Sequence, residues 1–152
     1  MTELAADDAP FLAALAAVTD DRWRELWAAL DALDGETTFA EWAGGEVVGT
    51  TEGDGHERPV VQVPYPLYTD AVERLRDAIG ASGLIVPYDW MAWDGLDRYR
   101  DPADLARAPA ADAVRLVVAI VRSERFGDGN ILAALQRDLL QAALARLRAE
   151  HP

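Results

Sequence analysis

The sequence contains no cysteine, no lysine and only two histidines among its 152 residues. Without cysteine the chain has no disulfide framework, no zinc–thiolate site and no thiol nucleophile. His56 lies in a predicted loop tip and His151 near the end of the chain, so neither histidine is placed for a Ser-His-Asp triad. No apolar run approaches the roughly 18–20 residues that a membrane-spanning helix needs. These absences predict a protein without a catalytic residue set and without membrane insertion.

Cofactor and metal motifs are also missing. The sequence has no phosphate-binding loop and no GxGxxG fingerprint. Glu52, Asp54, His56 and Glu57 could ligate a metal, but a glycine-rich acidic segment is more simply a solvated turn. The aspartates between positions 89 and 101 could form a carboxylate pair for acid–base chemistry, yet helix caps and surface charge explain most of them. We therefore predict no cofactor and no metal site.

The negative charge is concentrated in the first half of the chain. The net charge is −13, and residues 1–63 carry 14 acids against three arginines, whereas residues 64–152 carry 13 acids against 11 arginines. Like charge opposes an encounter with nucleic acid or an anionic membrane. The first residues are acidic where a signal peptide is basic, which predicts a cytoplasmic protein. The acidic half is either a solubilising surface or a docking face for a protein partner with a basic surface.

Most of the chain has helical periodicity. Trp23, Leu26, Trp27, Leu30 and Leu33 recur at helical spacing behind a Thr19 cap, and this stripe is typical of a core-facing helix. Similar signals predict further helices that begin near Pro10, Thr69, Pro102, Pro109 and Asn130, the last one running to about Glu150. The segment Val114–Arg122 is apolar on nearly every side, which predicts a central, buried helix.

One segment has a different composition. Residues 37–39, 47–51 and 60–63 are rich in strand-forming side chains, with a Gly44-Gly45 turn after the first and a polar tip after the second. Pro59, Pro64 and Pro66 mark the last strand as short or at an edge. The sequence thus predicts an α+β fold, predominantly α: one bundle-like helical domain with a small antiparallel β element near residues 37–63. An acidic part, 1–63, precedes a motif-bearing helical part, 64–152.

The arginines of the central helix need acceptors. Arg115 and Arg122 share one side of this helix, and Arg125 follows one turn later. A buried guanidinium without a partner is costly, and Asp89, which ends an apolar run, is the predicted partner. In the structural interpretation an Arg–Asp bridge fixes the helix against the loop. In the functional interpretation Arg122 and Arg125 bind an anionic ligand beside Trp90, Trp93 or Tyr99.

Two motifs resemble a known family. Tyr88-Asp89-Trp90-Met91-Ala92-Trp93 and Arg122-Ser123-Glu124-Arg125-Phe126-Gly127-Asp128-Gly129 match an aromatic-Asp-Trp-x-x-Trp element and an Arg-x-x-Arg-Phe-x-x-Gly element. Together they resemble an uncharacterised family of small prokaryotic proteins that is classified only as a domain of unknown function, over roughly residues 60–149. The resemblance implies no activity. It implies that one shared feature contains Asp89, Trp90, Trp93, Arg122, Arg125, Phe126 and Gly129.

Two hypotheses follow. The first is a non-enzymatic interaction or accessory protein, because the first half is acidic and a catalytic set is missing. The alternative is a protein, possibly an enzyme, that binds a small anionic ligand or a nucleotide through the arginines, Asp89 and the tryptophans. The alternative requires guanidinium groups that solvent can reach.

Overall fold

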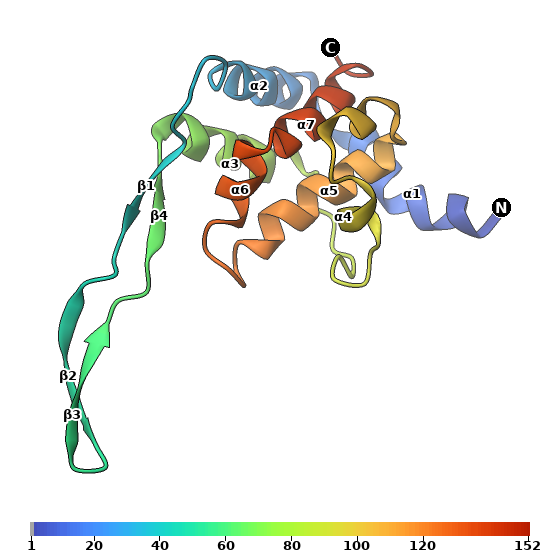
Figure 1. The fold of residues 1–152 in the computed structure, drawn as a ribbon. Helices are drawn as coiled ribbons and strands as arrows, with labels where there is room; N and C mark the ends of the chain where they lie inside the picture. Colours follow the sequence, from blue (N-terminus) through green and yellow to red (C-terminus); the bar gives the residue numbers. More distant parts are fainter. Residues whose placement is uncertain (1) are drawn as a thin grey trace.

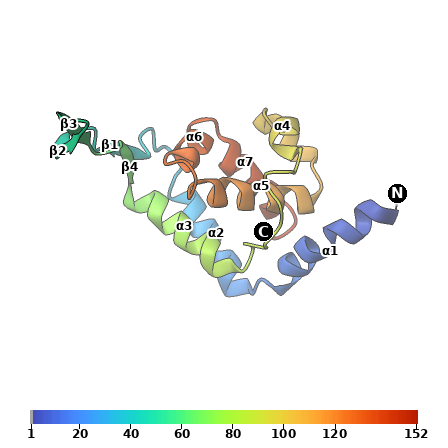
Figure 2. The ribbon, with the colours of Figure 1, turned by 90° about the horizontal axis from the view of Figure 1, so that it is seen from below.

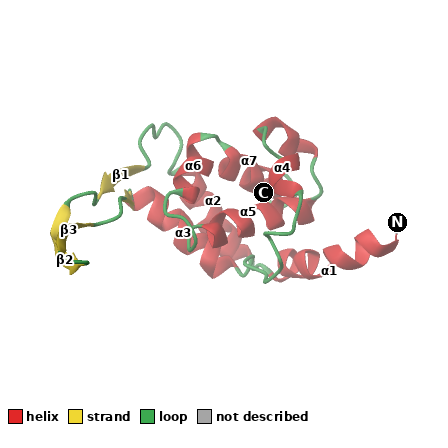
Figure 3. Cartoon of the chain, turned by 60° about the horizontal axis from the view of Figure 1, so that its bottom comes forward, coloured by secondary structure: helices red, strands yellow, loops and turns green. Residues whose placement is uncertain are grey.

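The computed structural model describes the backbone of residues 2–152 and the side chains of residues 8–152. In chain order the elements are α1 (Thr2–Ala17), α2 (Asp20–Asp31), β1 (Ala40–Ala43), β2 (Val47–Gly53), β3 (His56–Val61), β4 (Tyr65–Tyr68), α3 (Asp70–Ser82), α4 (Gly95–Arg98), the 3-10 helix η1 (Pro102–Arg107), α5 (Ala110–Ser123), α6 (Asn130–Gln136) and α7 (Leu139–Arg148). The prediction of a mainly helical α+β fold is confirmed. The helices form a body, and the strands extend from it as an arm (Figures 1 and 3).

The centre of the body is α5. Every residue from Ala110 to Ile120 is buried, as its nearly continuous apolar sequence predicts. Helices α1, α4, α6 and α7 all contact α5, and α2 packs against α3 and α7 (Figure 2). Each fully buried leucine on these helices contributes about 1.5–3 kcal/mol to folding. One core cluster therefore runs from Phe11 on α1 to Leu147 on α7.

The helix caps follow the predicted pattern. The Thr19 hydroxyl accepts a hydrogen bond from the N–H of Arg22, and the Thr69 hydroxyl accepts one from Val72. Two predicted boundaries are wrong. Pro10 lies inside α1 rather than at its start, because α1 already begins at Thr2. An internal proline costs the helix one hydrogen bond and adds a clash with the carbonyl four residues earlier. The predicted final helix is broken into α6 and α7 at Asp138, whose φ of 58° is left-handed, a conformation that aspartate tolerates.

The β-arm comprises residues 40–68. Strand β1 pairs with β4 from Ala40↔Tyr68 to Ala43↔Tyr65, and β2 pairs with β3 from Val47↔Val61 to Gly53↔His56; both pairs are antiparallel. Asp54 and Gly55 connect β2 to β3, with positive φ values of 53° and 76°. The arm is one long hairpin that points away from the helices (Figure 1).

The predicted strands differ from the observed ones in two places. Residues 37–39 are not a strand, and Gly44-Gly45 is not the turn of a hairpin, because the chain continues in the same direction into β2. Gly44 has a φ of 81°, and a Cβ there would lie 2.7 Å from the Val63 carbonyl oxygen, so this position joins the two ladders where the backbones approach closely. Strand β4 was not predicted, because Pro66 at its centre indicated the end of the β element.

Among the described residues, no helix is both long enough and apolar enough to cross a membrane.

Candidate functional site

A buried arginine lies at the centre of a polar network on α5. Arg115 is only 5% exposed, and its Nη1 donates to Oδ1 of Asp112 at 2.9 Å and pairs with Oδ1 of Asp8 at 2.7 Å. Its guanidinium also lies 4.3 Å from the centroid of the Phe11 ring. Burial acts to lower the pKa of Arg115, but the hydrogen bonds to Asp8 and Asp112 outweigh it and raise that pKa. Arg115 therefore stays charged and holds α1 against α5.

The second oxygen of Asp112 completes this network. Oδ2 accepts hydrogen bonds from the Tyr99 hydroxyl and, at 3.3 Å, from Nη1 of Arg98. Arg98 in turn donates to both oxygens of Asp94. Burial, followed by the bond to Asp112, raises the pKa of Tyr99. The buried carboxylate thus has acceptor bonds on both oxygens, which is what a charge in a low-dielectric interior requires.

The loop before α4 is tied to α5 by a tyrosine, not by the predicted aspartate. The Tyr88 hydroxyl donates to the Arg115 carbonyl oxygen at 2.6 Å, and burial raises the pKa of Tyr88. Asp89 is exposed and accepts a hydrogen bond from the N–H of Ala92 within its own turn. Asp89 forms no ion pair among the described side chains. The predicted bridge between Asp89 and an arginine is wrong, because carboxylates on α5 and α1 lie closer to Arg115.

The motif tryptophans have different surroundings. Trp93 is half-buried between the rings of Tyr88 and Tyr99, each 6.2 Å away. A Cβ at Gly95 would clash with Cζ2 of Trp93, so only a glycine leaves room for this ring. Trp90 meets Phe126 at a centroid distance of 6.0 Å, and Phe126 is 74% exposed. This contact joins the two motifs at the surface.

A hollow of about 330 Å³ opens beside Trp93. It is lined by Phe11, Tyr88, Asp89, Ala92, Trp93, Asp94 and Arg115. Two of the predicted site residues, Asp89 and Trp93, line it, but Arg122 and Arg125 do not. The one guanidinium in its wall belongs to Arg115 and already has carboxylate partners. The hollow has no arginine available for an incoming anion.

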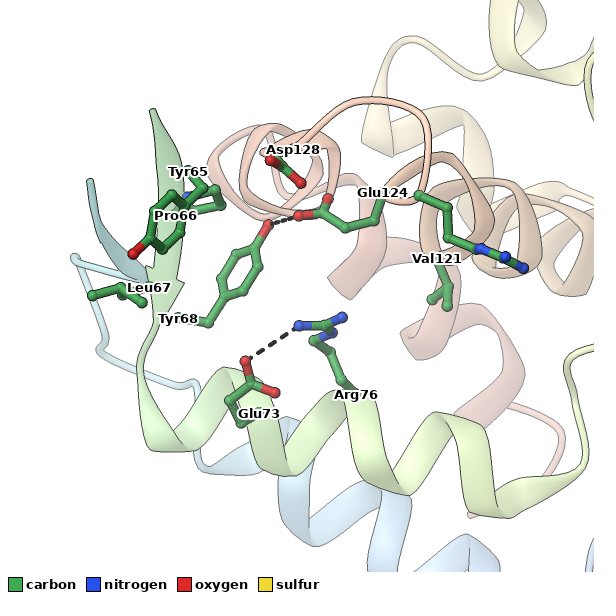
Figure 4. A pocket seen from close by; sticks show the side chains of 10 residues that line it. Tyr65, Pro66, Leu67, Tyr68, Glu73, Arg76, Val121, Glu124 and Asp128 are labelled. Carbon is green, nitrogen blue, oxygen red and sulfur yellow. Dashed lines mark hydrogen bonds and ion pairs between the residues drawn. The ribbon is translucent and has the colours of Figure 1, made fainter. Parts of the chain in front are cut away.

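The second motif surrounds a carboxylate at the root of the arm. Oε1 of Glu124 accepts from the Tyr68 hydroxyl at 2.6 Å and from the N–H of Gly129 at 3.1 Å, and Oε2 accepts from the N–H of Ile131 at 2.8 Å. Tyr68 also accepts at its hydroxyl oxygen from the N–H of Leu132 at 3.3 Å. Glu124 therefore satisfies two N–H groups at the start of α6. Its bond with Tyr68, drawn in Figure 4, links that helix start to β4. Burial and the neighbouring Glu124 raise the pKa of Tyr68.

Glu124 and Tyr68 were not among the site residues that the sequence predicted. Gly129 precedes α6 and has no side chain that could cap it, although its φ of 97° suits a glycine. A helix start without a Ser, Thr, Asp or Asn cap needs an acceptor from elsewhere, and the motif offers two acids before Gly129, Glu124 and Asp128; the acceptor is Glu124. This need for a capping acceptor was the sequence signal that could have identified Glu124. Tyr68 had no comparable signal, because only the antiparallel pairing of β4 brings it to α6.

A pocket of about 510 Å³ lies between β4, α3 and the end of α5. It is lined by Tyr65, Pro66, Leu67, Tyr68, Glu73, Arg76, Val121, Glu124, Arg125 and Asp128 (Figure 4). Arg76 lies 5.3 Å from the centroid of the Tyr68 ring and bonds Glu73 at 3.2 Å. Arg125 is exposed and Arg122 half-buried, and neither forms an ion pair among the described side chains. The predicted site is thus divided: Asp89 and Trp93 lie in one hollow, and Arg125 lies in the other.

Comparison with known families agrees with the resemblance of the motifs. The sequence pattern of DUF6508, described as a family of unknown function, matches residues 18–151. The chain belongs to this family. The match includes the β-arm and both motifs, and it extends the resemblance from the second half of the chain to almost all of it. No curated protein and no solved structure matches the chain. Membership in DUF6508 therefore brings no activity with it.

Proposed function

We propose that this DUF6508 protein is a non-enzymatic interaction module and that the β-arm binds its protein partner. The observation that carries the proposal is that none of residues 40–68 is buried. Tyr68, at the root of the arm, packs against the hydrophobic core, but the rest of the arm, which as a whole contains nearly a fifth of the chain, lies outside that core. A hairpin that buries none of its residues and extends far into solvent is best explained by what it contacts outside the chain.

The apolar side chains of the arm support this function. Six of them are roughly half-exposed or more: Trp42, Val47, Val48, Val61, Val63 and Leu67. A two-stranded hairpin is only marginally stable in water, and these side chains have no second layer to pack against. Apolar groups that gather on one protruding element are typical of a protein interaction surface.

Charge indicates the chemistry of the partner. Residues 40–68 contain five acids and, as their only arginine, Arg58. The acids repel phosphate backbones and anionic lipid, whereas they attract a basic protein surface and raise its association rate. We therefore propose a partner with a basic surface.

Site-specific photo-crosslinking in the producing cells tests the proposal. A photoreactive residue replaces Val60 on the arm, and in the matched control it replaces Leu96 on α4; the two side chains are 41% and 39% exposed. We expect an adduct with a basic protein from position 60 and none from position 96. Identical adduct patterns from both positions would contradict the proposal.

A second candidate function is binding of a small anion in the pocket at the root of the arm. The observation in its favour is that Arg125 lines this pocket without an ion pair among the described side chains. Against it, Glu73, Glu124 and Asp128 line the same pocket and repel an anion. A thermal-shift titration with inorganic phosphate and with succinate tests this candidate. Stabilisation that Arg125→Ala abolishes and Arg100→Ala preserves would support it.

A further inference from the structure

The outer edge of β2 is open along its whole length. Within the described chain, β2 hydrogen-bonds only to β3, so its other side presents unpaired backbone groups. The two central turn residues, Asp54 and Gly55, both have positive φ, which is the signature of a tight two-residue hairpin turn. In such a hairpin the pair next to the turn, Gly53 and His56, is hydrogen-bonded, and the pairs alternate from there. Glu52 and Thr50 therefore direct their backbone N–H and C=O groups outward.

The outer edge of β3 is different. By the same alternation, Glu57 and Pro59 face outward on β3, because they pair with Glu52 and Thr50. Pro59 has no N–H, so this edge lacks one of its donors and resists the addition of another strand. Strand β2 contains no proline and is rich in valine and threonine, which favour β structure. The arm thus has one blocked edge and one open edge.

Near the tip, two acids lie directly opposite each other. Glu52 pairs with Glu57 across the ladder, so both side chains project from the same face. Like charges at directly opposite positions destabilise a hairpin. Among the described side chains neither glutamate forms an ion pair, and Arg58 lies 3.9 Å from Asp54 instead. A cation placed over this face would relieve the repulsion.

We propose that an extended basic segment of the partner adds to the arm as a third strand along the outer edge of β2. Its backbone pairs with the outward groups of Thr50 and Glu52, and its lysine or arginine side chains lie over Glu52 and Glu57. This inference rests on the proposed function and specifies how the partner is bound. Strand addition provides affinity through main-chain hydrogen bonds, and alternate side chains provide selectivity. A second copy of the chain is a poorer occupant, because its arm carries the same excess of acids.

A matched pair of proline variants tests which edge is used. Glu52→Pro and Glu57→Pro each remove one carboxylate and one outward N–H, but on opposite edges, and neither removes an internal ladder bond. The probe is a fluorescent peptide of about eight residues, a usual strand length, that alternates lysine and valine. Its binding is followed by anisotropy. We expect Glu52→Pro to weaken binding about tenfold or more and Glu57→Pro to weaken it by less than about threefold.

The wild-type protein provides a test that does not depend on the folding of a variant. N-methylation of alternate peptide bonds keeps the charge of the probe but prevents edge pairing, and we expect it to abolish binding. A peptide that alternates glutamate and valine controls for charge and should not bind. In the complex with the basic peptide, the amide hydrogens of Thr50 and Glu52 should become protected from exchange, whereas that of Glu57 should not.

Several outcomes overturn the inference. Equal weakening by the two prolines, or binding that survives N-methylation, would mean that the peptide is held by charge alone. Self-association of the protein that Glu52→Pro abolishes would assign the edge to a second copy. Failure of the basic peptide to bind would overturn strand addition but not the proposed function if crosslinking from position 60 still yields a basic partner. Failure of both experiments would overturn both.

Discussion

The helical body and the β-arm are stabilised in different ways. In the body every residue from Ala110 to Ile120 is buried, and the buried charges of Arg115 and Asp112 bond each other and further partners. In the arm no residue between 40 and 68 is buried, and its order depends on cross-strand pairing and turn geometry. The body therefore accounts for the stability of the protein. The arm exposes apolar and acidic side chains to solvent, and the stability of the fold gives no reason for this exposure.

The largest expected effect is the loss of the buried arginine. Arg115→Ala leaves Asp112, only 6% exposed, without its main counter-charge. We expect the free energy of unfolding to fall by about 3–5 kcal/mol. The matched control on the same helix is Arg122→Ala, which breaks no ion pair among the described side chains and should cost less than about 1 kcal/mol. Urea denaturation measures both, and equal losses would contradict the distinction between the two arginines.

Alkaline pH should have the next largest effect on the stability of the protein. The pKa values of Tyr68, Tyr88 and Tyr99 are all raised, so in the folded protein these hydroxyls keep their protons above the ordinary pKa of about 10. The unfolded chain releases those protons above that pH, so its free energy falls relative to that of the folded state. Stability is therefore complete below pH 10 and declines as the pH rises from there.

Thermal unfolding as a function of pH measures this decline. The triple variant with phenylalanine at positions 68, 88 and 99 should lose most of the slope between pH 10 and the end of the accessible range. An unchanged slope in that variant would show that other groups are responsible.

Glu124 tests the junction of the two regions. Glu124→Ala removes the acceptor for the Tyr68 hydroxyl and for two N–H groups at the start of α6, and we expect a loss of about 1–3 kcal/mol. Glu73→Ala, which removes an exposed ion pair beside the same pocket, should cost less than about 1 kcal/mol. Hydrogen exchange at Ile131 and Leu132 should rise only in the first variant. Unchanged exchange there would contradict the capping role of Glu124.

A smaller effect is expected where the arm rests on the body. Gly129 has a φ of 97°, and a Cβ there would lie 3.0 Å from the Trp42 ring. Gly35 has a φ of 81° with nothing within 4 Å, so Gly35→Ala carries only the backbone strain, about 1 kcal/mol. Gly129→Ala should cost more than this control and shift the fluorescence of Trp42. Equal costs would mean that the tryptophan moves aside freely.

The smallest effect on stability is expected from shortening the arm. Residues 47–61 are replaced by Asn-Gly, which forms the same kind of two-residue turn between Glu46 and Gln62. The N–H of Gln62 donates to the Glu46 carbonyl oxygen at 3.0 Å, so the new ends already face each other. We expect the free energy of unfolding to change by less than about 0.5 kcal/mol, while adducts with the partner disappear. A large loss of stability would show that the arm supports the body after all.

Local sequence signals were sufficient to predict much of the helical body. The caps at Thr19 and Thr69 and the buried helix α5 could be predicted because capping and apolar periodicity act within a few residues. The break at Asp138 could not be predicted, because it interrupts an otherwise continuous helical pattern. Strand β4 could not be predicted, because a proline at its centre, Pro66, indicates the end of a strand. Both strands of a two-stranded ladder are edge strands, so Pro66 is tolerated there opposite Trp42.

The candidate site was predicted only in part. The motifs directed attention to Asp89, Trp90 and Phe126, and the structure does bring Trp90 and Phe126 together. It separates Asp89 from the arginines, because the choice of an ion-pair partner depends on which carboxylates lie nearest in space. Asp8 is 107 positions away from Arg115 in the chain, yet it lies 2.7 Å away in the structure.

By itself the sequence determined that this protein is acidic, mainly helical and organised around one buried helix, because composition and periodicity are local properties. Tertiary structure alone decided that the β element extends as an arm with one open edge, that Tyr88 rather than Asp89 ties the first motif to α5, and that Glu124 links the second motif to β4. Those features depend on cross-strand register and on contacts between residues far apart in the chain, which local propensity does not encode.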